Sequence, residues 1–432
     1  MTTAFVLADV AGYRPLPLRI YIQCTTSFDG SEAVVGLTSG YRNIKRRPRG
    51  SRTERHVSST RTQILIIRQG IRNKITVTIM LKRFAVENYR GFKNRVELDL
   101  SKVGKYKFHT QYIEDDLVGK CLIFGRNGCG KTNFGLALFD IVSVLTDYQI
   151  EGKQKDPFGF LNGDSDLQFT TFTYVFDGES GEIEYEYRKT APDAIVYERL
   201  DSGGKTIFLR DRDKTDYSGL SAIGSADFHI DIGDGALSVL RFIANSTNQP
   251  DGSPISTVMD FVKGMLYVRS VQDGNTYIGL TRGSEPLQDY IVRNGLANEF
   301  GDVLREMAGL NVELGVLRAE GAQERLVFKT EHKLLDFNGY ASSGSRLLML
   351  HYYWIKHLDK VTFLYLDEFD AYYHYELAEK VLLRLSSVQG IQCVFTSHNT
   401  SLVSNRILRP DCYMLLDSRG ITPLPELTDR EI

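Results

Sequence analysis

An eight-residue glycine-rich segment limits most strongly what this chain can fold into. The segment runs from Gly125 to Thr132 and reads GRNGCGKT, which satisfies the pattern GxxxxGK[ST]. Glycines let backbone N–H groups turn inward around phosphates, while the lysine adds a positive charge and the threonine hydroxyl a magnesium ligand. The run KCLIF at 120–124 predicts a strand before the loop, and Thr132–Tyr148 predicts a helix after it. The candidate nucleotide-binding residues are Gly125, Asn127, Gly128, Gly130, Lys131, Thr132 and Asn133.

A second motif, VTFLYLDEFD from Val361, joins an apolar run to a pair of acids. The run predicts a buried parallel strand, and ligands bind at the carboxyl ends of such strands. We therefore expect Asp367 to hold Mg²⁺ together with Thr132, and Glu368 to act as a general base on the attacking water. Two acidic residues also commonly end an apolar strand without any catalytic role. The presence of the phosphate loop in the same chain favours the catalytic interpretation.

The pattern of apolar residues predicts the remaining elements. Alternation at period two predicts a hairpin over Leu81–Leu100, and an antiparallel sheet of three or four strands over 167–210. A helical period covers Leu287–Met307, and two strands follow at 311–317 and 324–330. From Ser342 the order helix, strand, helix, strand, strand returns to an α/β pattern. No sustained heptad predicts a long coiled coil.

Composition excludes several classes of protein. The chain has 432 residues, of which 42% are hydrophobic and 25% charged, as in a globular protein of two or three structural units. No apolar run is long enough for a membrane-spanning helix, and the amino terminus lacks the features of a signal peptide. The five cysteines have no CxxC spacing, which argues against a disulfide framework or a zinc site. We therefore expect a cytoplasmic protein without membrane contact.

Charge is distributed unevenly along the chain. Residues 1–79 hold 13 of the 52 Lys and Arg but only 4 of the 54 Asp and Glu, a net charge of +9 against −11 for the rest. Because an apolar/polar alternation begins directly after Met80, the favoured interpretation of 1–79 is a basic, non-core or disordered extension. A basic arm that binds nucleic acid, a small module and a targeting segment are the alternatives.

Four motifs together resemble a known family. GRNGCGKTN, the segment SSGS at Ser342–Ser345, LDEFD and TSHNT look like the ABC-type ATPase head shared by the RecF, SMC and OLD proteins. Within that group the chain is most similar to prokaryotic AAA-type ATP-binding proteins associated with phage defence. The resemblance covers Met80 to Asp429, and no TOPRIM nuclease module follows in this chain. It implies an α/β fold of the P-loop NTPase, ABC-ATPase type. The ATPase domain would span 80–432, with an antiparallel β-subdomain and a helical insertion within 151–340.

The resemblance also assigns roles to residues outside the first two motifs. Ser342, Ser343, Gly344 and Ser345 would form the signature loop, which contacts the γ-phosphate bound by an opposing protomer. Hydroxyls and a glycine before the apolar helix Arg346–Trp354 fit a helix N-terminus with free N–H donors, but they also fit a plain N-cap. Asp370 would lie in the loop between subunits, and Gln272 is a candidate Q-loop residue. His398, which follows the strand IQCVFTS, would sense the γ-phosphate, although a histidine there is also common as a surface residue.

The predicted function is that of an ATP-dependent switch. ATP and Mg²⁺ are the implied ligands, and two heads of the same chain would close around two ATPs as a dimer or higher homo-oligomer. Closure would control a separate effector protein, such as a nuclease, in anti-phage defence. The alternative is a RecF- or SMC-like DNA-repair ATPase that binds DNA directly, in which case DNA binding should depend on salt. A transporter ATPase is disfavoured by the SSGS signature.

Overall fold

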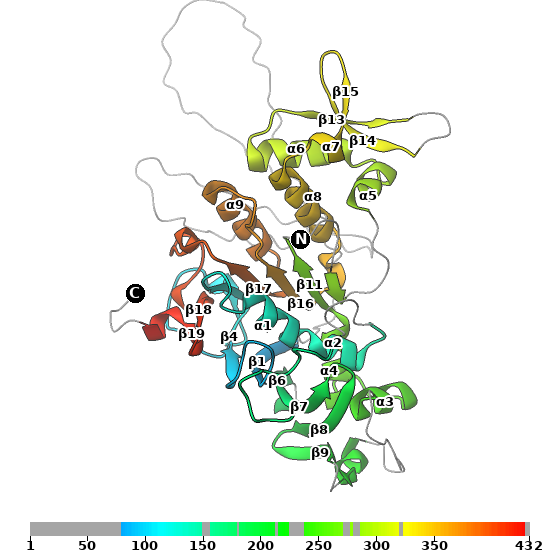
Figure 1. Ribbon diagram of the computed structural model, residues 1–432, viewed down its shortest axis with the longest axis vertical. Helices are drawn as coiled ribbons and strands as arrows, with labels where there is room; N and C mark the ends of the chain where they lie inside the picture. The colour runs from blue at the N-terminus through cyan, green and yellow to red at the C-terminus, as the bar shows by residue number, and fades with distance from the viewer. Residues whose placement is uncertain are drawn as a thin grey trace, which may run out of the picture. The chain divides into compact units, whose positions relative to one another are not determined.

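A seven-stranded, mostly parallel sheet carries both motifs in the computed structural model. The structure describes residues 79–148, 156–178, 181–211, 215–223, 237–270, 277–279, 286–318 and 323–427 (Figure 1), all of which belong to one compact unit. The predicted extension lies outside the described residues except for Ile79, and so does Gln272. None of the described helices is long and apolar enough to cross a membrane.

The mostly parallel sheet has the strand order β12-β11-β16-β17-β5-β18-β19. Its five central strands run parallel, and the short edge strands β12 and β19 are antiparallel to their neighbours. The strand bounds are β5 Lys120–Phe124, β11 Met265–Arg269, β12 Tyr277–Gly279, β16 Phe363–Asp367, β17 Gln392–Ser397, β18 Tyr413–Asp417 and β19 Gly420–Pro423. Every residue of β5, β16 and β17 is buried, because layers of structure cover both faces of the sheet.

A second sheet is antiparallel throughout and has the order β10-β9-β8-β7-β6-β1-β2. Its strands are β1 Met80–Glu87, β2 Val96–Asp99, β6 Thr170–Gly178, β7 Gly181–Ala191, β8 Ala194–Ser202, β9 Lys205–Arg210 and β10 Thr215–Asp216. The predicted hairpin over Leu81–Leu100 is confirmed as β1 and β2. The predicted antiparallel strands within 167–210 are confirmed as β6 to β9. A further pair, β3 Ile113–Glu114 and β4 Leu117–Val118, forms a two-stranded ribbon.

Helix α1 (Lys131–Leu138) packs between the two sheets (Figure 1). On one side the ring of Phe134 meets Phe84 of β1 edge to face, with 5.3 Å between ring centroids. On the other side Gly135 lies so close to β16 that an added Cβ would approach the Tyr365 ring to 2.6 Å. The absence of a side chain at position 135 therefore lets the loop and helix lie close to the parallel sheet.

Two helices predicted as continuous are interrupted in the structure. The segment Thr132–Tyr148 forms α1 and α2 (Asp140–Leu145), which separate at Phe139. The start of α2 is anchored to β7, because the Asp140 carboxylate accepts hydrogen bonds from Lys189 at 2.8 and 3.0 Å and from Tyr187 at 2.9 Å.

The predicted helix Leu287–Met307 forms α5 (Leu287–Arg293) and α6 (Ala297–Ala308). Between them Gly295 adopts a left-handed φ of 65°, a conformation that ends helices.

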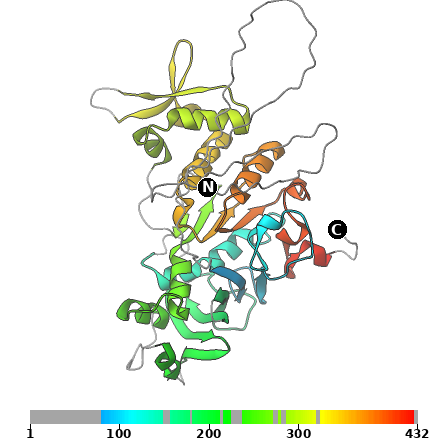
Figure 2. The same cartoon turned by 180° about the vertical axis from the view of Figure 1, so that it is seen from behind.

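The remaining helices surround these sheets. They are α3 Val239–Ser246, α4 Pro254–Lys263, α7 Phe337–Tyr340, α8 Ser343–Ile355 and α9 Tyr375–Ser386. The two strands predicted near 311–330 are present as β13 (Glu313–Leu317) and β14 (Arg325–Lys329), and β15 (Leu334–Asp336) adds a third. This small sheet packs against α5, α6 and α7 (Figures 1 and 2).

Candidate nucleotide-binding and hydrolysis site

The glycine-rich loop connects the end of β5 to the start of α1, as the sequence predicts. Gly128 and Gly130 have φ values of 78° and 106°, which residues with a side chain rarely adopt. Gly130 also lies against Phe92, whose ring would be 2.7 Å from an added Cβ. Asn127 and Gly128 are exposed at the tip of the loop. The backbone conformation of this loop therefore requires glycine at positions 128 and 130.

Lys131 folds back over the loop. Its side chain is buried, with 5% of the residue exposed, and its Nζ donates to the carbonyl oxygens of Gly125 at 2.8 Å and Arg126 at 3.2 Å. The N-cap of α1 is Gly130, and no side chain of the described residues caps the first turn, so its backbone N–H groups remain available. A positive charge and free N–H donors thus converge at one helix N-terminus, an arrangement that suits an anion.

The Asp367 carboxylate is fully buried at the carboxyl end of β16 and accepts three hydroxyl hydrogen bonds. Thr132 and Tyr267 donate to Oδ2 at 2.7 and 3.1 Å, and Thr396 donates to Oδ1 at 2.8 Å. Burial, with Asp367 nearby, raises the pKa of Tyr267 well above its usual value, so its hydroxyl stays protonated as a donor. The Thr132 and Asp367 oxygens, side by side, are the kind of hard ligand that Mg²⁺ takes.

Glu368 has a backbone conformation that sets its side chain apart from Asp367. Its φ is 51°, in the left-handed region that is uncommon for a residue other than glycine and concentrated at functional sites. Its N–H donates to Thr396 Oγ1 at 2.7 Å, so the threonine that bonds Asp367 also fixes the Glu368 backbone. The Glu368 carboxylate has no hydrogen-bond partner among the residues that the structure describes.

Asp370 points into the protein. It is 5% exposed and accepts a 2.7 Å hydrogen bond from Ser397, while its Oδ1 has no partner within the described ranges. Burial raises the pKa of Asp370, and the nearby charges of His398 and Lys131 act in the opposite direction. His398 follows β17 and is exposed. Asp370 is thus held by Ser397 at the end of β17, whereas His398, the residue after Ser397, is exposed.

The segment Ser342–Ser345 forms the N-terminus of α8. Ser342 is the N-cap, and its Oγ accepts the N–H of Ser345 at 3.1 Å. Ser342 and Ser343 are exposed, Ser345 is buried, and Gly344 lies against Tyr372, whose carbonyl oxygen would be 3.1 Å from an added Cβ. Across the described parts of the chain, no hydrogen bond joins this segment to the glycine-rich loop. Both predicted phosphate-binding segments, the glycine-rich loop and Ser342–Ser345, are therefore present in one chain, but no hydrogen bond connects them among the described residues.

The loop between β16 and α9 connects α8 to the acidic end of the parallel sheet. Tyr372 contacts Gly344 through its backbone, and the next residue, Tyr373, is hydrogen-bonded to Nδ1 of His351 in α8 at 2.9 Å. Asp370 lies in the same loop. The loop between β16 and α9 therefore meets α8 at two points, Gly344 and His351.

Sequence reasoning missed three groups at this site. Tyr267 and Arg269 come from β11, which is the parallel neighbour of β16, and Arg269 pairs in register with Asp367. Arg90, in the turn between β1 and β2, places Nη1 3.4 Å from the Oδ1 of Asn133. The order of strands in the sheet could not be read from the chain, so no signal pointed to the β11 residues.

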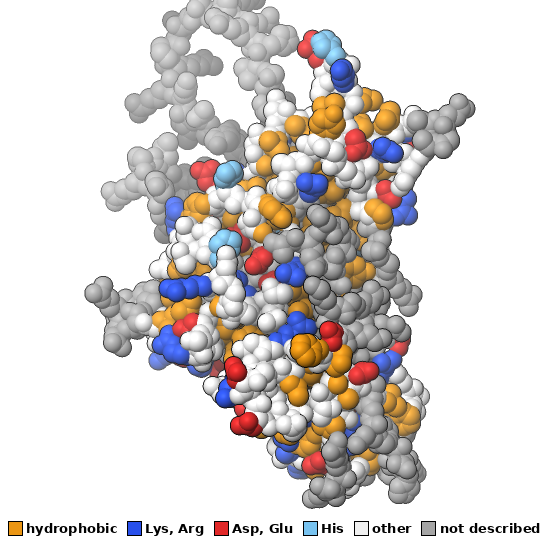
Figure 3. Space-filling view, viewed as in Figure 1, with side chains coloured by type: hydrophobic (Ala, Val, Ile, Leu, Met, Phe, Trp, Pro, Cys, Tyr) orange, Lys and Arg blue, Asp and Glu red, His pale blue; other side chains and the backbone are white. Residues whose placement is uncertain are grey.

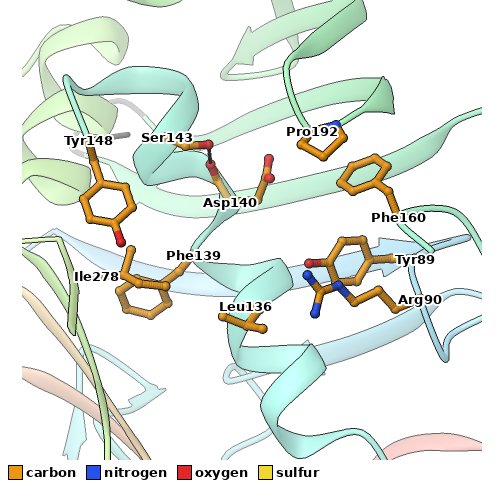
Figure 4. Close-up of a pocket in the computed structure, with 10 residues that line it drawn as sticks. All are labelled: Tyr89, Arg90, Leu136, Phe139, Asp140, Ser143, Tyr148, Phe160, Pro192 and Ile278. Atoms are coloured by element: carbon orange, nitrogen blue, oxygen red, sulfur yellow. Dashed lines mark hydrogen bonds between the residues drawn. The ribbon is translucent and has the colours of Figure 1, made fainter. Parts of the chain in front are cut away.

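A cavity lies beside Arg90 and is lined in part by residues of α1 and α2 (Figure 4). Its walls combine apolar side chains, among them Leu136 and Phe160, with Arg90 and Asp140. The Asp140 carboxylate is held by Lys189 and Tyr187. The cavity therefore adjoins Asn133 and the predicted nucleotide site through the Arg90 side chain.

Residues 122–404 match a protein family described as "AAA domain, putative AbiEii toxin, Type IV TA system". The chain belongs to this family. With the loop between β5 and α1, the acidic end of β16 and the antiparallel second sheet, the family match confirms the predicted fold class: an α/β P-loop NTPase of ABC-ATPase type.

Solved structures similar to this chain at low identity include two SMC head domains and RecF. An SMC head domain from Thermotoga maritima is 14% identical, covering 79% of this chain and 98% of its own, with a TM-score of 0.37. An Smc head bound to the C-terminal domain of ScpA, derived from Pyrococcus furiosus, is 11% identical, with coverages of 81% and 98% and a TM-score of 0.42. The recombination mediator RecF with ATP is 13% identical, with coverages of 80% and 99% and a TM-score of 0.37. No curated protein matches the sequence.

Proposed function

We propose that this protein binds ATP with Mg²⁺, hydrolyses it, and uses the bound nucleotide to associate two heads. The observation that carries the proposal is the 2.7 Å hydrogen bond from Thr132 to Asp367. It joins the hydroxyl at the end of the glycine-rich loop to the buried carboxylate at the end of β16. Those two oxygens and the Lys131 ammonium are the groups that Mg²⁺ and the β- and γ-phosphates of ATP require.

The residues present fit both ligands. The ammonium of Lys131 donates to two carbonyl oxygens of the loop. Phosphate oxygens of a bound nucleotide would replace these carbonyls as its acceptors. Thr132 and Asp367 would hold the metal ion, directly or through water, and the ion would supply positive charge beside the phosphates. The N–H groups at the start of α1 donate to the same anion.

Glu368 serves as the general base in this proposal. The residue is partly buried, its carboxylate has no hydrogen-bond partner among the described residues, and its backbone is fixed through Thr396. It can accept the proton of the water that attacks the terminal phosphate, while Asp367 stays committed to the metal. A positioned base of this kind contributes about 10²- to 10⁴-fold to a rate.

The signature segment would act on a second copy of the chain. Ser342 and Ser343 are exposed at the N-terminus of the 13-residue helix α8, and they make no hydrogen bond to the loop of their own chain within the described ranges. Hydroxyls and backbone N–H groups at such an end would bind the terminal phosphate presented by a partner head. ATP would then be shared between two heads, and hydrolysis would release them.

The switch is proposed to control the activity of a separate effector protein, such as a nuclease, in anti-phage defence. The family description, which names a toxin and a TA system, supports a system of more than one component. Direct DNA binding, as in a DNA-repair ATPase, is the alternative. On the face seen in Figure 3, basic and acidic side chains of the described residues are interspersed, which favours a protein effector over a DNA backbone.

ATP turnover by the purified chain tests the proposal. We expect Mg²⁺-dependent phosphate release that disappears in Lys131→Ala and falls about 10²- to 10⁴-fold in Glu368→Gln. Adding duplex DNA at low salt should leave the rate unchanged, whereas a DNA-repair ATPase would be stimulated. Equal rates for the wild type and both variants would contradict the proposed site.

A further inference from the structure

Arg269 lies at the carboxyl end of β11, directly beside Asp367 in the parallel register. Register partners in a sheet direct their side chains to the same face. Two residues earlier on that face, the rings of Tyr267 and Tyr365 stack with 5.5 Å between centroids, and Gly135 of α1 covers them. Arg269 therefore occupies the layer of the sheet that faces the glycine-rich loop.

The guanidinium of Arg269 is held loosely. Its Nε lies 3.8 Å from Oδ2 of Asp367, which is beyond hydrogen-bond distance, and this buried nitrogen has no partner among the described residues. The side chain is 33% exposed, so the outer part of the guanidinium is open to solvent. A structural arginine–carboxylate pair usually makes two short parallel hydrogen bonds, and this pair makes none.

Arg269 is also the only cationic side chain within 4.0 Å of Asp367 in the described part of the chain. A divalent cation bound at Thr132 and Asp367 would compete with Arg269 for Oδ2 and repel it. A guanidinium displaced there has a new anion within reach, because the phosphates occupy the same end of α1. Its planar fork of donors suits a phosphate group.

We propose that Arg269 is a binding residue that recognises the γ-phosphate. Its charge lies beside Asp367, and the guanidinium would bind the terminal phosphate once ATP and Mg²⁺ occupy the site. The head thereby distinguishes ATP from ADP through a residue of its own chain, in addition to the signature segment of a partner. This inference rests on the proposed function, and it names the part of the site that makes binding selective for the triphosphate.

Calorimetric titration of the full-length chain with ADP and with a non-hydrolysable ATP analogue, each with Mg²⁺, tests the inference. Arg269→Gln should weaken binding of the triphosphate at least tenfold and leave ADP affinity within twofold of the wild type. Arg269→Lys keeps the positive charge but not the planar set of donors, so its affinity for the triphosphate should fall less than that of Arg269→Gln. Arg419→Gln, which removes an exposed arginine paired with Asp417, is the matched control and should change neither affinity.

The Mg²⁺ requirement gives a second readout that a merely structural role would not move. Because Arg269 no longer competes for Asp367, ADP binding by Arg269→Gln should reach half-saturation at a lower Mg²⁺ concentration than in the wild type. If Arg269→Gln lost affinity equally for both nucleotides, or for neither, the proposed role of Arg269 would be overturned. A wild-type chain that binds neither nucleotide would instead overturn the proposed function itself.

Discussion

The Thr132 hydroxyl donates a 2.7 Å hydrogen bond to the carboxylate of Asp367, 235 residues further along the chain. This bond joins the glycine-rich loop to the acidic end of β16. The groups proposed to hold the metal are therefore pre-positioned by the fold, and a bound ion would only have to insert between two oxygens already in contact. Such pre-organisation lowers the cost of assembling the site at the moment of binding.

Lys131→Ala should abolish tight nucleotide binding while the chain remains folded. The ammonium is the charge nearest the predicted phosphates, and a charge-assisted hydrogen bond contributes about 1.5–3 kcal/mol, so affinity should fall at least ten- to a hundredfold. Calorimetric titration with ATP and Mg²⁺ measures the effect. Lys93→Ala, which removes an exposed lysine, is the control. An unchanged dissociation constant for Lys131→Ala would refute the phosphate-loop assignment.

Thr396→Val should slow turnover without weakening nucleotide binding. The variant has nearly the same shape but loses the hydrogen bond to Asp367 at 2.8 Å and the acceptor for the Glu368 N–H at 2.7 Å. Because Glu368 would then be less well fixed, kcat should fall at least tenfold and the affinity for ATP should change little. Thr400→Val, at an exposed position, should leave both constants unchanged. A wild-type kcat in Thr396→Val would show that this threonine does not position the base.

His351 should make folding stability depend on pH. Burial lowers the pKa of this imidazole from 6.5 to about 3. Between these values the unfolded chain binds a proton that the folded head excludes, so stability falls as pH falls, by up to about 1.4 kcal/mol per pH unit. In urea titrations at about pH 6 and pH 4, His351→Gln should show a smaller difference in the free energy of unfolding. His332→Gln, at an exposed position, should behave as the wild type, and an unchanged difference in His351→Gln would contradict the effect.

A chain that lacks residues 2–73 should keep its ATPase activity, because all described elements belong to the unit that begins at Lys74. Turnover and DNA affinity are measured side by side on the shortened and full-length chains. An inactive or insoluble shortened chain would mean that the basic extension is needed for the fold. Retained turnover with lost DNA affinity would mean that the extension is a nucleic-acid-binding arm.

The strand, loop and helix around Gly125–Thr132 and the buried strand that ends at Asp367 could be predicted from the sequence because each motif is local. The loop from Gly125 to Thr132 and the strand before Asp367 combine their residue types within a few positions, and local sequence fixes their conformation. The neighbourhood of Asp367 could not be predicted, because it depends on which strands lie side by side. Only the pairing of β11 with β16 shows that Tyr267 and Arg269 belong to the site.

The helix breaks have two different origins. The dipeptide Asn294–Gly295 is a recognisable helix-ending signal, and the left-handed φ of Gly295 agrees with it, so this break could have been read from the sequence. The break at Phe139 carries no such signal. There the position of α2 depends on the buried contacts of Asp140 with Lys189 and Tyr187, which come from a distant strand.

The central claim is that ATP joins two heads through the segment Ser342–Ser345. Glu368→Gln keeps the shape of the base but not its charge, so ATP should bind and remain intact. Ser343→Asp then adds a negative charge at the exposed first turn of α8, where it favours the helix but repels a phosphate. We prefer Ser343 to Gly344 because a side chain at Gly344 would crowd the Tyr372 carbonyl. Asn338→Asp, at another exposed position of the described surface, is the matched control.

Sedimentation velocity of Glu368→Gln, with Mg²⁺ and with or without ATP, tests this claim most directly. We predict that ATP shifts the protein to a larger associated form, that Ser343→Asp reverses the shift, and that Asn338→Asp does not. Identical sedimentation of Glu368→Gln with and without ATP, in a protein that binds the nucleotide, would contradict the association switch.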